Sequence, residues 1–174
     1  SVLYMVRSNH VAEAIELQAR VDKIAEGAAL MTETKVERKF IDGLSDTVSN
    51  FALERVLYEN YKELGVPSYT EEEYAYADAL AETYPGNDQI PGVAAENDSA
   101  AKEQVAAMQA AVGHKMNAFL APLYQKDAFK AGSTDVGDVS WLTPTAQTHV
   151  APWPNGCPGH SWQNVSCGHT SIGH

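Results

Sequence analysis

The chain has 174 residues, enough for one domain or for pieces of two larger ones. Its formal net charge of −11 argues against non-specific binding to nucleic acid and to anionic membrane surfaces. Two cysteines do not make a disulfide framework, no signal peptide is visible, and no apolar run approaches the ~18 residues of a membrane span. We therefore expect a cytoplasmic protein that binds neither nucleic acid nor membrane.

The first fifty residues predict a strand, a helix and a second strand. Residues 2–6 form a short apolar run that is consistent with a strand. Apolar residues recur at helical spacing over residues 11–31. Residues 32–41 alternate in the way that a strand with one solvated face does. This order is typical of a βαβ or split-βαβ half of an α+β sandwich.

Three further helices are predicted after a connector. The first covers residues 51–64, where an apolar stripe ends at a Gly and a Pro. Thr70 and Glu73 form a capping-box pattern for the second, which runs to about residue 83. The third is an alanine-rich helix over about residues 99–119. The tail that follows is loop-rich, with short strands possible at 139–142 and 146–151. We therefore expect an α/β (α+β) protein.

The tail carries most of the side chains that bind metals. Four of the six histidines and both cysteines lie in residues 132–174. They could form a self-contained zinc knuckle, but the order Cys-x2-His-x6-Cys-x-His lacks the two close ligand pairs of structural zinc sites. The side chains concerned are Cys157, His160, Cys167, His169 and His174.

A different interpretation takes His160 alone as a ligand of a catalytic metal centre whose other ligands lie elsewhere in a longer protein. His160 follows a Pro-Gly turn and precedes a tryptophan that could wall a site. Asp135 and Asp138 could orient a metal-bound histidine, or could cap their own turn through Asx hydrogen bonds. Arg7 could be a solvent-exposed strand end or could bind a carboxylate through its guanidinium group.

Four strings in the tail carry a resemblance to a known family. They are GSTDVGDVSW at 132–141, TPTA at 143–146, HSWQ at 160–163 and TSIGH at 170–174. The strings are similar to the C-terminal part of the p-aminobenzoyl-glutamate hydrolase-like amidohydrolases, in the aminoacylase/carboxypeptidase metallopeptidase family. The resemblance extends over the whole chain.

The resemblance implies two domains. Residues 1–49 resemble the closing strand–helix–strand of the inserted α+β lid, or dimerisation, domain of that family. Residues 50–174 resemble the C-terminal part of its catalytic domain, truncated, which implies a mixed sheet with flanking helices. A homo- or hetero-oligomer that assembles through the lid domain is implied as well.

The resemblance also implies a two-metal amide hydrolase. Its substrate would be a small N-acyl amino acid such as p-aminobenzoyl-glutamate, attacked by a metal-activated water. The metal would be manganese or zinc, with two ions per site in the parent protein. His160 takes the role of the late metal ligand, and Asp135 matches an acidic loop residue, although Thr134 stands where many relatives have Glu. Arg7 and Asn50 are candidates for binding a substrate carboxylate.

The general base and the other metal ligands of the family are not found in this sequence. No catalytic residue is therefore assigned, and we expect the polypeptide alone to be inactive. Ser1 opens in strand-like sequence and His174 follows no closing helix or strand, so we expect a C-terminal fragment. The alternative is a non-catalytic interaction or dimerisation module in which the strand at residues 2–6 pairs with another chain.

Overall fold

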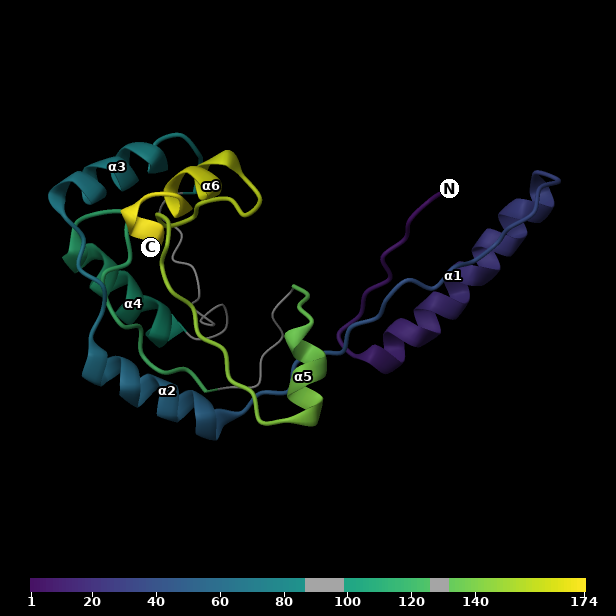
Figure 1. The fold of residues 1–174 in the computed structure, drawn as a ribbon, viewed down its shortest axis with the longest axis horizontal. Helices are drawn as coiled ribbons and strands as arrows, with labels where there is room; N and C mark the ends of the chain where they lie inside the picture. The colour runs from purple at the N-terminus through teal and green to yellow at the C-terminus, as the bar shows by residue number, and fades with distance from the viewer. Residues whose placement is uncertain (87–98, 126–131) are drawn as a thin grey trace. The chain divides into compact units, whose positions relative to one another are not determined.

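The computed structural model describes residues 1–86, 99–125 and 132–174. The regular structure in these ranges is helical (Figure 1). Its elements are α1 (Val11–Met31), α2 (Phe51–Leu64), α3 (Glu71–Ala81), α4 (Ser99–Val112), α5 (Val136–Leu142), α6 (Trp162–Gly168) and the 3-10 helix η2 (Ser171–Gly173).

The predicted α/β fold with a mixed sheet is wrong, because the described residues contain no strand. Residues 2–6, 34–41 and 146–151 lack regular structure, and residues 139–142 lie in α5. A strand is stabilised by ladder hydrogen bonds and cross-strand side-chain pairs, which an apolar run cannot supply by itself. The α+β character expected for a lid domain is therefore not observed here either.

The helix predictions agree better with the structure. α1 and α2 have the predicted bounds, and the capping box at the start of α3 is confirmed. Glu73 N donates to Thr70 Oγ1 at 3.3 Å, and Thr70 N donates to Glu73 Oε2 at 2.7 Å. α4 ends at Val112 rather than near residue 119, because Gly113 has a φ of +76° and ends the helix in the left-handed region. None of the described helices combines the length and the apolar character needed to cross a lipid bilayer.

The chain divides into two compact units. Unit 1 comprises Ser1–Asn50 together with residues 129–145, and unit 2 comprises residues 51–128 and 146–174. The assignment of residues 1–49 to a lid domain and of residues 50–174 to a catalytic domain stays a prediction.

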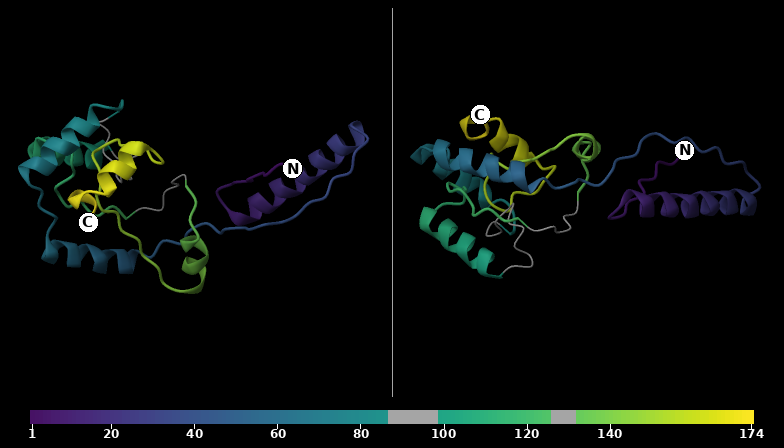
Figure 2. Two further views of the ribbon diagram at one scale, coloured as in Figure 1. Left: turned by 45° about the horizontal axis from the view of Figure 1, so that its top comes forward. Right: turned by 90° about the horizontal axis from the view of Figure 1, so that it is seen from below.

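Unit 1 is built around α1, none of whose side chains is buried. The residues after α1 return alongside it (Figures 1 and 2), and Arg38 forms an ion pair with Asp22 of the helix. Large apolar side chains of the N-terminal segment and of α1 stay exposed, including Leu3 at 72% and Ile24 at 70%. The described part of unit 1 therefore has no buried hydrophobic core.

Unit 2 has a small core in which the tail packs against α3. The Tyr76 and Ser166 hydroxyls hydrogen bond at 2.6 Å, and the Ser171 hydroxyl donates to the Glu73 carboxylate. These contacts link α3 to α6 and η2. The buried residues of the core are Ala77, Leu80, Met116, Cys167 and Ile172, with Tyr69, Tyr74, Ala151 and Trp153 packed against them.

Candidate functional site

His160 lies in an exposed loop immediately before α6. Its φ of +57° places it in the left-handed region, which costs a non-glycine residue roughly 1–2 kcal/mol. The next residue holds this turn closed: the Ser161 hydroxyl donates to Pro158 O at 2.7 Å and accepts from Asn164 N at 3.2 Å, which caps α6. The φ angle places His160 in a tight turn, and its role as a metal ligand stays a prediction.

Both ends of the segment around His160, residues 155–163, are hydrogen bonded to residues outside the segment. We call this segment the His160 loop. At one end, Asn155 N donates to Lys115 O at 2.8 Å, and Asn155 O accepts from the Tyr84 hydroxyl at 2.9 Å. At the other end, Gln163 Nε2 donates to Thr83 Oγ1 at 3.2 Å. The loop is therefore anchored at its ends while the His160 side chain faces solvent.

The two cysteines of the tail have surroundings that disfavour metal binding. Cys167 is fully buried in the core, and burial raises the pKa of its thiol to about 11. Burial also raises the pKa of the half-buried Cys157. Since the thiolate is the form that binds metals, neither side chain is prepared as a ligand.

The residues described here fit one metal-ligand position and not a complete centre. Within the three described ranges, no group of three or more His, Cys, Asp or Glu side chains is arranged to hold a metal ion. The zinc knuckle that the tail composition suggested is thus not formed by these residues. His160 offers a single exposed imidazole, whereas catalytic zinc sites use three protein ligands.

Asp135 and Asp138 lie in unit 1, whereas His160 lies in unit 2. Asp135 is exposed and precedes α5 without a side-chain capping bond. Asp138 Oδ1 accepts from Ser45 N at 2.9 Å. Hydrogen bonds from the Ser45 side chain and backbone lower the pKa of Asp138. Asp138 thus has a structural partner in unit 1, and support of His160 by these two carboxylates stays a prediction.

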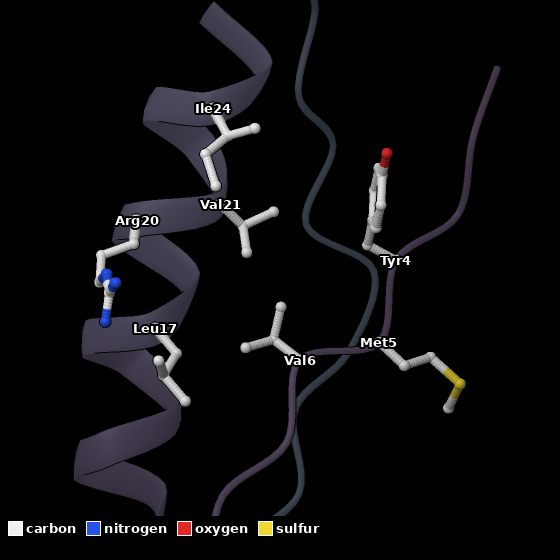
Figure 3. Close-up of a pocket in the computed structure, with 7 residues that line it drawn as sticks. All are labelled: Tyr4, Met5, Val6, Leu17, Arg20, Val21 and Ile24. Carbon is white, nitrogen blue, oxygen red and sulfur yellow. The ribbon is translucent and has the colours of Figure 1, made fainter.

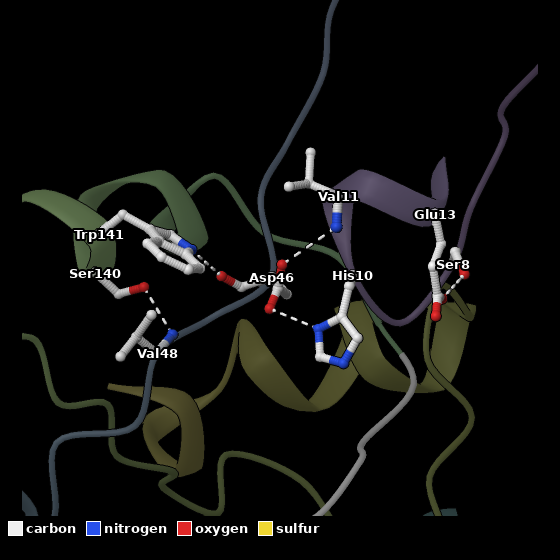
Figure 4. A network of polar contacts seen from close by, with 8 residues as sticks. All are labelled: Ser8, His10, Val11, Glu13, Asp46, Val48, Ser140 and Trp141. Atoms are coloured by element: carbon white, nitrogen blue, oxygen red, sulfur yellow. Dashed lines mark hydrogen bonds and ion pairs between the residues drawn. The ribbon is translucent and has the colours of Figure 1, made fainter. Parts of the chain in front are cut away.

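Further contacts dock α5 on residues 45–48 (Figure 4). Ser140 Oγ accepts from Val48 N at 2.8 Å, and Trp141 Nε1 donates to Asp46 O at 2.7 Å. The Asp46 carboxylate also reaches His10 Nδ1 at 3.1 Å, and this hydrogen bond lowers the pKa of Asp46. We call this set of interactions, together with the bond between Ser45 and Asp138, the α5 contact.

The two candidates for substrate binding also lie in unit 1. Arg7 is exposed, and its Nη2 donates to the thioether sulfur of Met5 at 3.8 Å. Asn50 is half-buried and directly precedes α2. A role of either residue in binding a substrate carboxylate stays a prediction.

Sequence reasoning missed an aspartate–histidine pair in unit 2. His114 Nδ1 lies 2.8 Å from Asp78 Oδ2, and Asp78 Oδ1 accepts from Lys115 N at 2.7 Å. The Tyr74 ring stacks on the imidazole with 4.1 Å between ring centroids. The pair ties α3 to the residues after α4. No motif signals it, because the two side chains are 36 positions apart in the sequence.

Comparison with known proteins finds one informative relative. The chain is 39% identical over 176 aligned positions to one of the subunits of p-aminobenzoyl-glutamate hydrolase from Escherichia coli (strain K12). The alignment covers 99% of this chain and 36% of that protein. This similarity confirms the family resemblance. No protein-family model and no solved structure matches the chain.

The strings that carry the resemblance to the p-aminobenzoyl-glutamate hydrolases occur in both units. Residues 132–141 include α5 and the α5 contact, in unit 1. Residues 160–163 open α6, and residues 170–174 contain η2, in unit 2. The chain spans about a third of the length of that relative.

Proposed function

We propose that this chain is part of a metal-dependent amidohydrolase of the cytoplasm. The enzyme would hydrolyse the amide bond of an N-acyl amino acid such as p-aminobenzoyl-glutamate with a metal-activated water. The observation that carries the proposal is the 39% identity over 99% of the chain to a hydrolase subunit. The general base and most metal ligands would come from polypeptide outside these residues.

In this proposal His160 supplies one ligand to a centre of two manganese or zinc ions. A neutral imidazole is the commonest protein ligand of such metals, and the His160 ring is exposed. The strained backbone of His160 and the anchored ends of its loop are what a prepared ligand needs. Two residues later Trp162 is 63% exposed and offers an aromatic surface for an aryl substrate.

A chimeric enzyme tests the proposal. The 174 residues would replace the matched segment of the E. coli protein, assembled with the rest of that enzyme, and release of p-aminobenzoate and glutamate would be measured with Mn²⁺ or Zn²⁺. We expect the chimera to be active and the isolated chain to be inactive. His160→Gln in the chimera should lower kcat/KM by roughly 100-fold or more, since even changes outside the ligand shell cost 10–100-fold.

His169→Gln is the matched control, because His169 is an exposed histidine at the end of α6. It should leave the activity of the chimera unchanged. Full activity of the His160→Gln chimera would refute the ligand role. Metal-dependent amidase activity of the isolated chain would refute the view that its site is incomplete.

The exposed apolar surface of unit 1 favours a second candidate, a dimerisation module. A shallow groove separates the N-terminal segment from α1 (Figure 3), and the commonest soluble assembly is a symmetric dimer. Its occupant would be the same groove of a second copy of this chain. The groove is lined by Tyr4, Met5, Val6, Leu17, Arg20, Val21 and Ile24.

Sedimentation velocity of the chain tests this second candidate. We expect a dimer at tens of micromolar that Ile24→Glu dissociates, because Ile24 is 70% exposed and lines the groove. Leu142→Glu is the control, since Leu142 is 88% exposed and lies outside the groove. A monomer at all concentrations, or equal dissociation by both variants, would remove the groove as the dimer contact.

A further inference from the structure

We propose that Thr83 and Tyr84 are positioning residues that together hold the His160 loop, and with it the backbone and ring of His160, in one orientation. These two residues directly follow α3 and its C-cap. The inference rests on the proposed function, because it takes His160 as the metal ligand that needs to be held.

Tyr84 is hydrogen bonded to Asn155 at the N-terminal end of the His160 loop. Tyr84 is 6% exposed and Asn155 is 2% exposed, so their hydrogen bond is shielded from water. The Tyr84 hydroxyl donates to Asn155 O, and Asn155 N donates to Lys115 O. Both backbone polar groups of Asn155 therefore have fixed partners. Burial raises the pKa of Tyr84 to about 12, so the donor proton is retained at physiological pH.

Thr83 is hydrogen bonded to Gln163 at the C-terminal end of the loop. The Thr83 hydroxyl donates its single proton to Leu80 O at 2.7 Å, which leaves its oxygen to accept from Gln163 Nε2 at 3.2 Å. Gln163 is 7% exposed. The C-terminal end of the loop is thereby linked, through Thr83, to Leu80 in the last turn of α3. Thr83 is adjacent in sequence to Tyr84, which holds the N-terminal end of the loop.

Two residues between these attachments have backbone angles in the left-handed region. Gly156 and His160 both have positive φ, +65° and +57°. A residue such as histidine keeps this conformation only where the surroundings over-determine it. Two adjacent residues just after α3 and its C-cap hold the two ends of the loop, and the bond from the Ser161 hydroxyl to Pro158 O closes the turn within it. The backbone on both sides of His160 is therefore held by bonds to Thr83 and Tyr84.

Tyr84→Phe tests the inference in the 174-residue chain, because it removes only the hydroxyl. Tyr69→Phe is the matched control: the Tyr69 hydroxyl also donates to a backbone carbonyl of the tail, Ala151 O at 3.1 Å, but outside the loop. The readouts are amide hydrogen exchange over residues 155–163 and the NMR signals of the His160 ring, assigned with His160→Gln and titrated with Zn²⁺ alone.

Tyr84→Phe should shift the ring signals without metal, speed amide exchange in the loop roughly tenfold, and weaken the response to Zn²⁺ roughly tenfold. Thr83→Val should act in the same direction, whereas Thr83→Ser keeps the hydroxyl and should restore wild-type behaviour. The Thr83 pair also decides the matter should Tyr84→Phe fail to fold.

The outcomes separate the two proposals. Unchanged ring signals and loop exchange in both Tyr84→Phe and Thr83→Val would overturn the positioning role. Equal shifts in Tyr84→Phe and Tyr69→Phe would overturn it as well, because the effect would belong to the core in general. If Tyr84→Phe shifts the ring signals while His160→Gln leaves the activity of the chimera unchanged, the ligand role falls and the positioning role is supported.

Discussion

Replacing Gly137 by alanine should release α5 from the segment on which it rests. A Cβ at this position would lie 2.1 Å from Ser45 O and 3.1 Å from Ser45 C. These are backbone atoms, which cannot rotate aside as a long side chain can. Overpacking costs roughly 1–3 kcal/mol, and the backbone clash places this case at the upper end. Alanine returns about 1 kcal/mol of helix propensity, which leaves a net cost of about 2 kcal/mol.

Amide hydrogen exchange at two positions reads this cost directly. Ser45 N donates to Asp138 of α5, and Val48 N donates to Ser140 of α5. A cost of about 2 kcal/mol corresponds to an opening equilibrium roughly 30 times more favourable. Both amides should therefore exchange roughly 30 times faster in Gly137→Ala than in the wild-type chain.

Gly27→Ala is the control, because Gly27 lies in α1 of the same unit and an added Cβ there would meet no atom within 4 Å. It should leave exchange at Ser45 and Val48 unchanged while it stabilises α1 by about 0.5–1 kcal/mol. Wild-type exchange at both amides in a folded Gly137→Ala chain would show that α5 does not rest on this segment.

Three further predictions concern a cap, a carboxylate and the thiols. Thr70→Ala should lower the free energy of unfolding of unit 2 by about 1 kcal/mol in thermal denaturation, whereas Thr70→Ser should retain it. Asp138 has a lowered pKa, so it stabilises the α5 contact when ionised. Protection of the Ser45 amide, corrected for intrinsic exchange, should be full at neutral pH. It should be lost as the pH falls below 3.8, the ordinary pKa of the carboxyl group, and through the lower pKa of the folded state. The Asp138→Asn variant should show no such pH-dependent loss. Iodoacetamide at about pH 8 should modify Cys157 before Cys167, because Cys167 is fully buried with a pKa of about 11; equal rates by mass spectrometry would contradict its burial.

The elements that the sequence predicts well are those whose signals are local. α1 and α2 have apolar periodicity over 21 and 14 residues, which is long enough to distinguish a helix. The start of α3 has a reciprocal cap that involves only Thr70 and Glu73. These features depend on contacts within one helix turn, so they are readable without tertiary structure.

The elements that the sequence misjudges depend on distant partners. Residues 139–142 are a short apolar run, which periodicity cannot assign to strand or helix, and the docking on residues 45–48 accompanies their helical form. α6 is not predicted, although Ser161 is a recognisable N-cap residue, because seven residues are too few to show a helical period.

The candidate site also combines features that could be predicted from local sequence with features that could not. The Pro-Gly turn before His160 is readable from the sequence, and the structure places His160 in an exposed loop. The positive φ of His160 and the attachment of its loop to Thr83 and Tyr84 could not be predicted, because they depend on residues far earlier in the chain.

The α5 contact bears on how the chain is made. The hydrogen bonds between α5 and residues 45–48 join positions 92 to 95 residues apart, with α2, α3 and α4 between them. At synthesis rates of about 5–20 residues per second, residues 45–48 wait roughly 5–20 s on the ribosome for α5. During that interval α1 has already been synthesised, whereas the segment that completes unit 1 has not. Nascent chains stalled before residue 136 should therefore leave the Ser45 and Val48 amides open to hydrogen exchange, and chains extended beyond residue 145 should protect them.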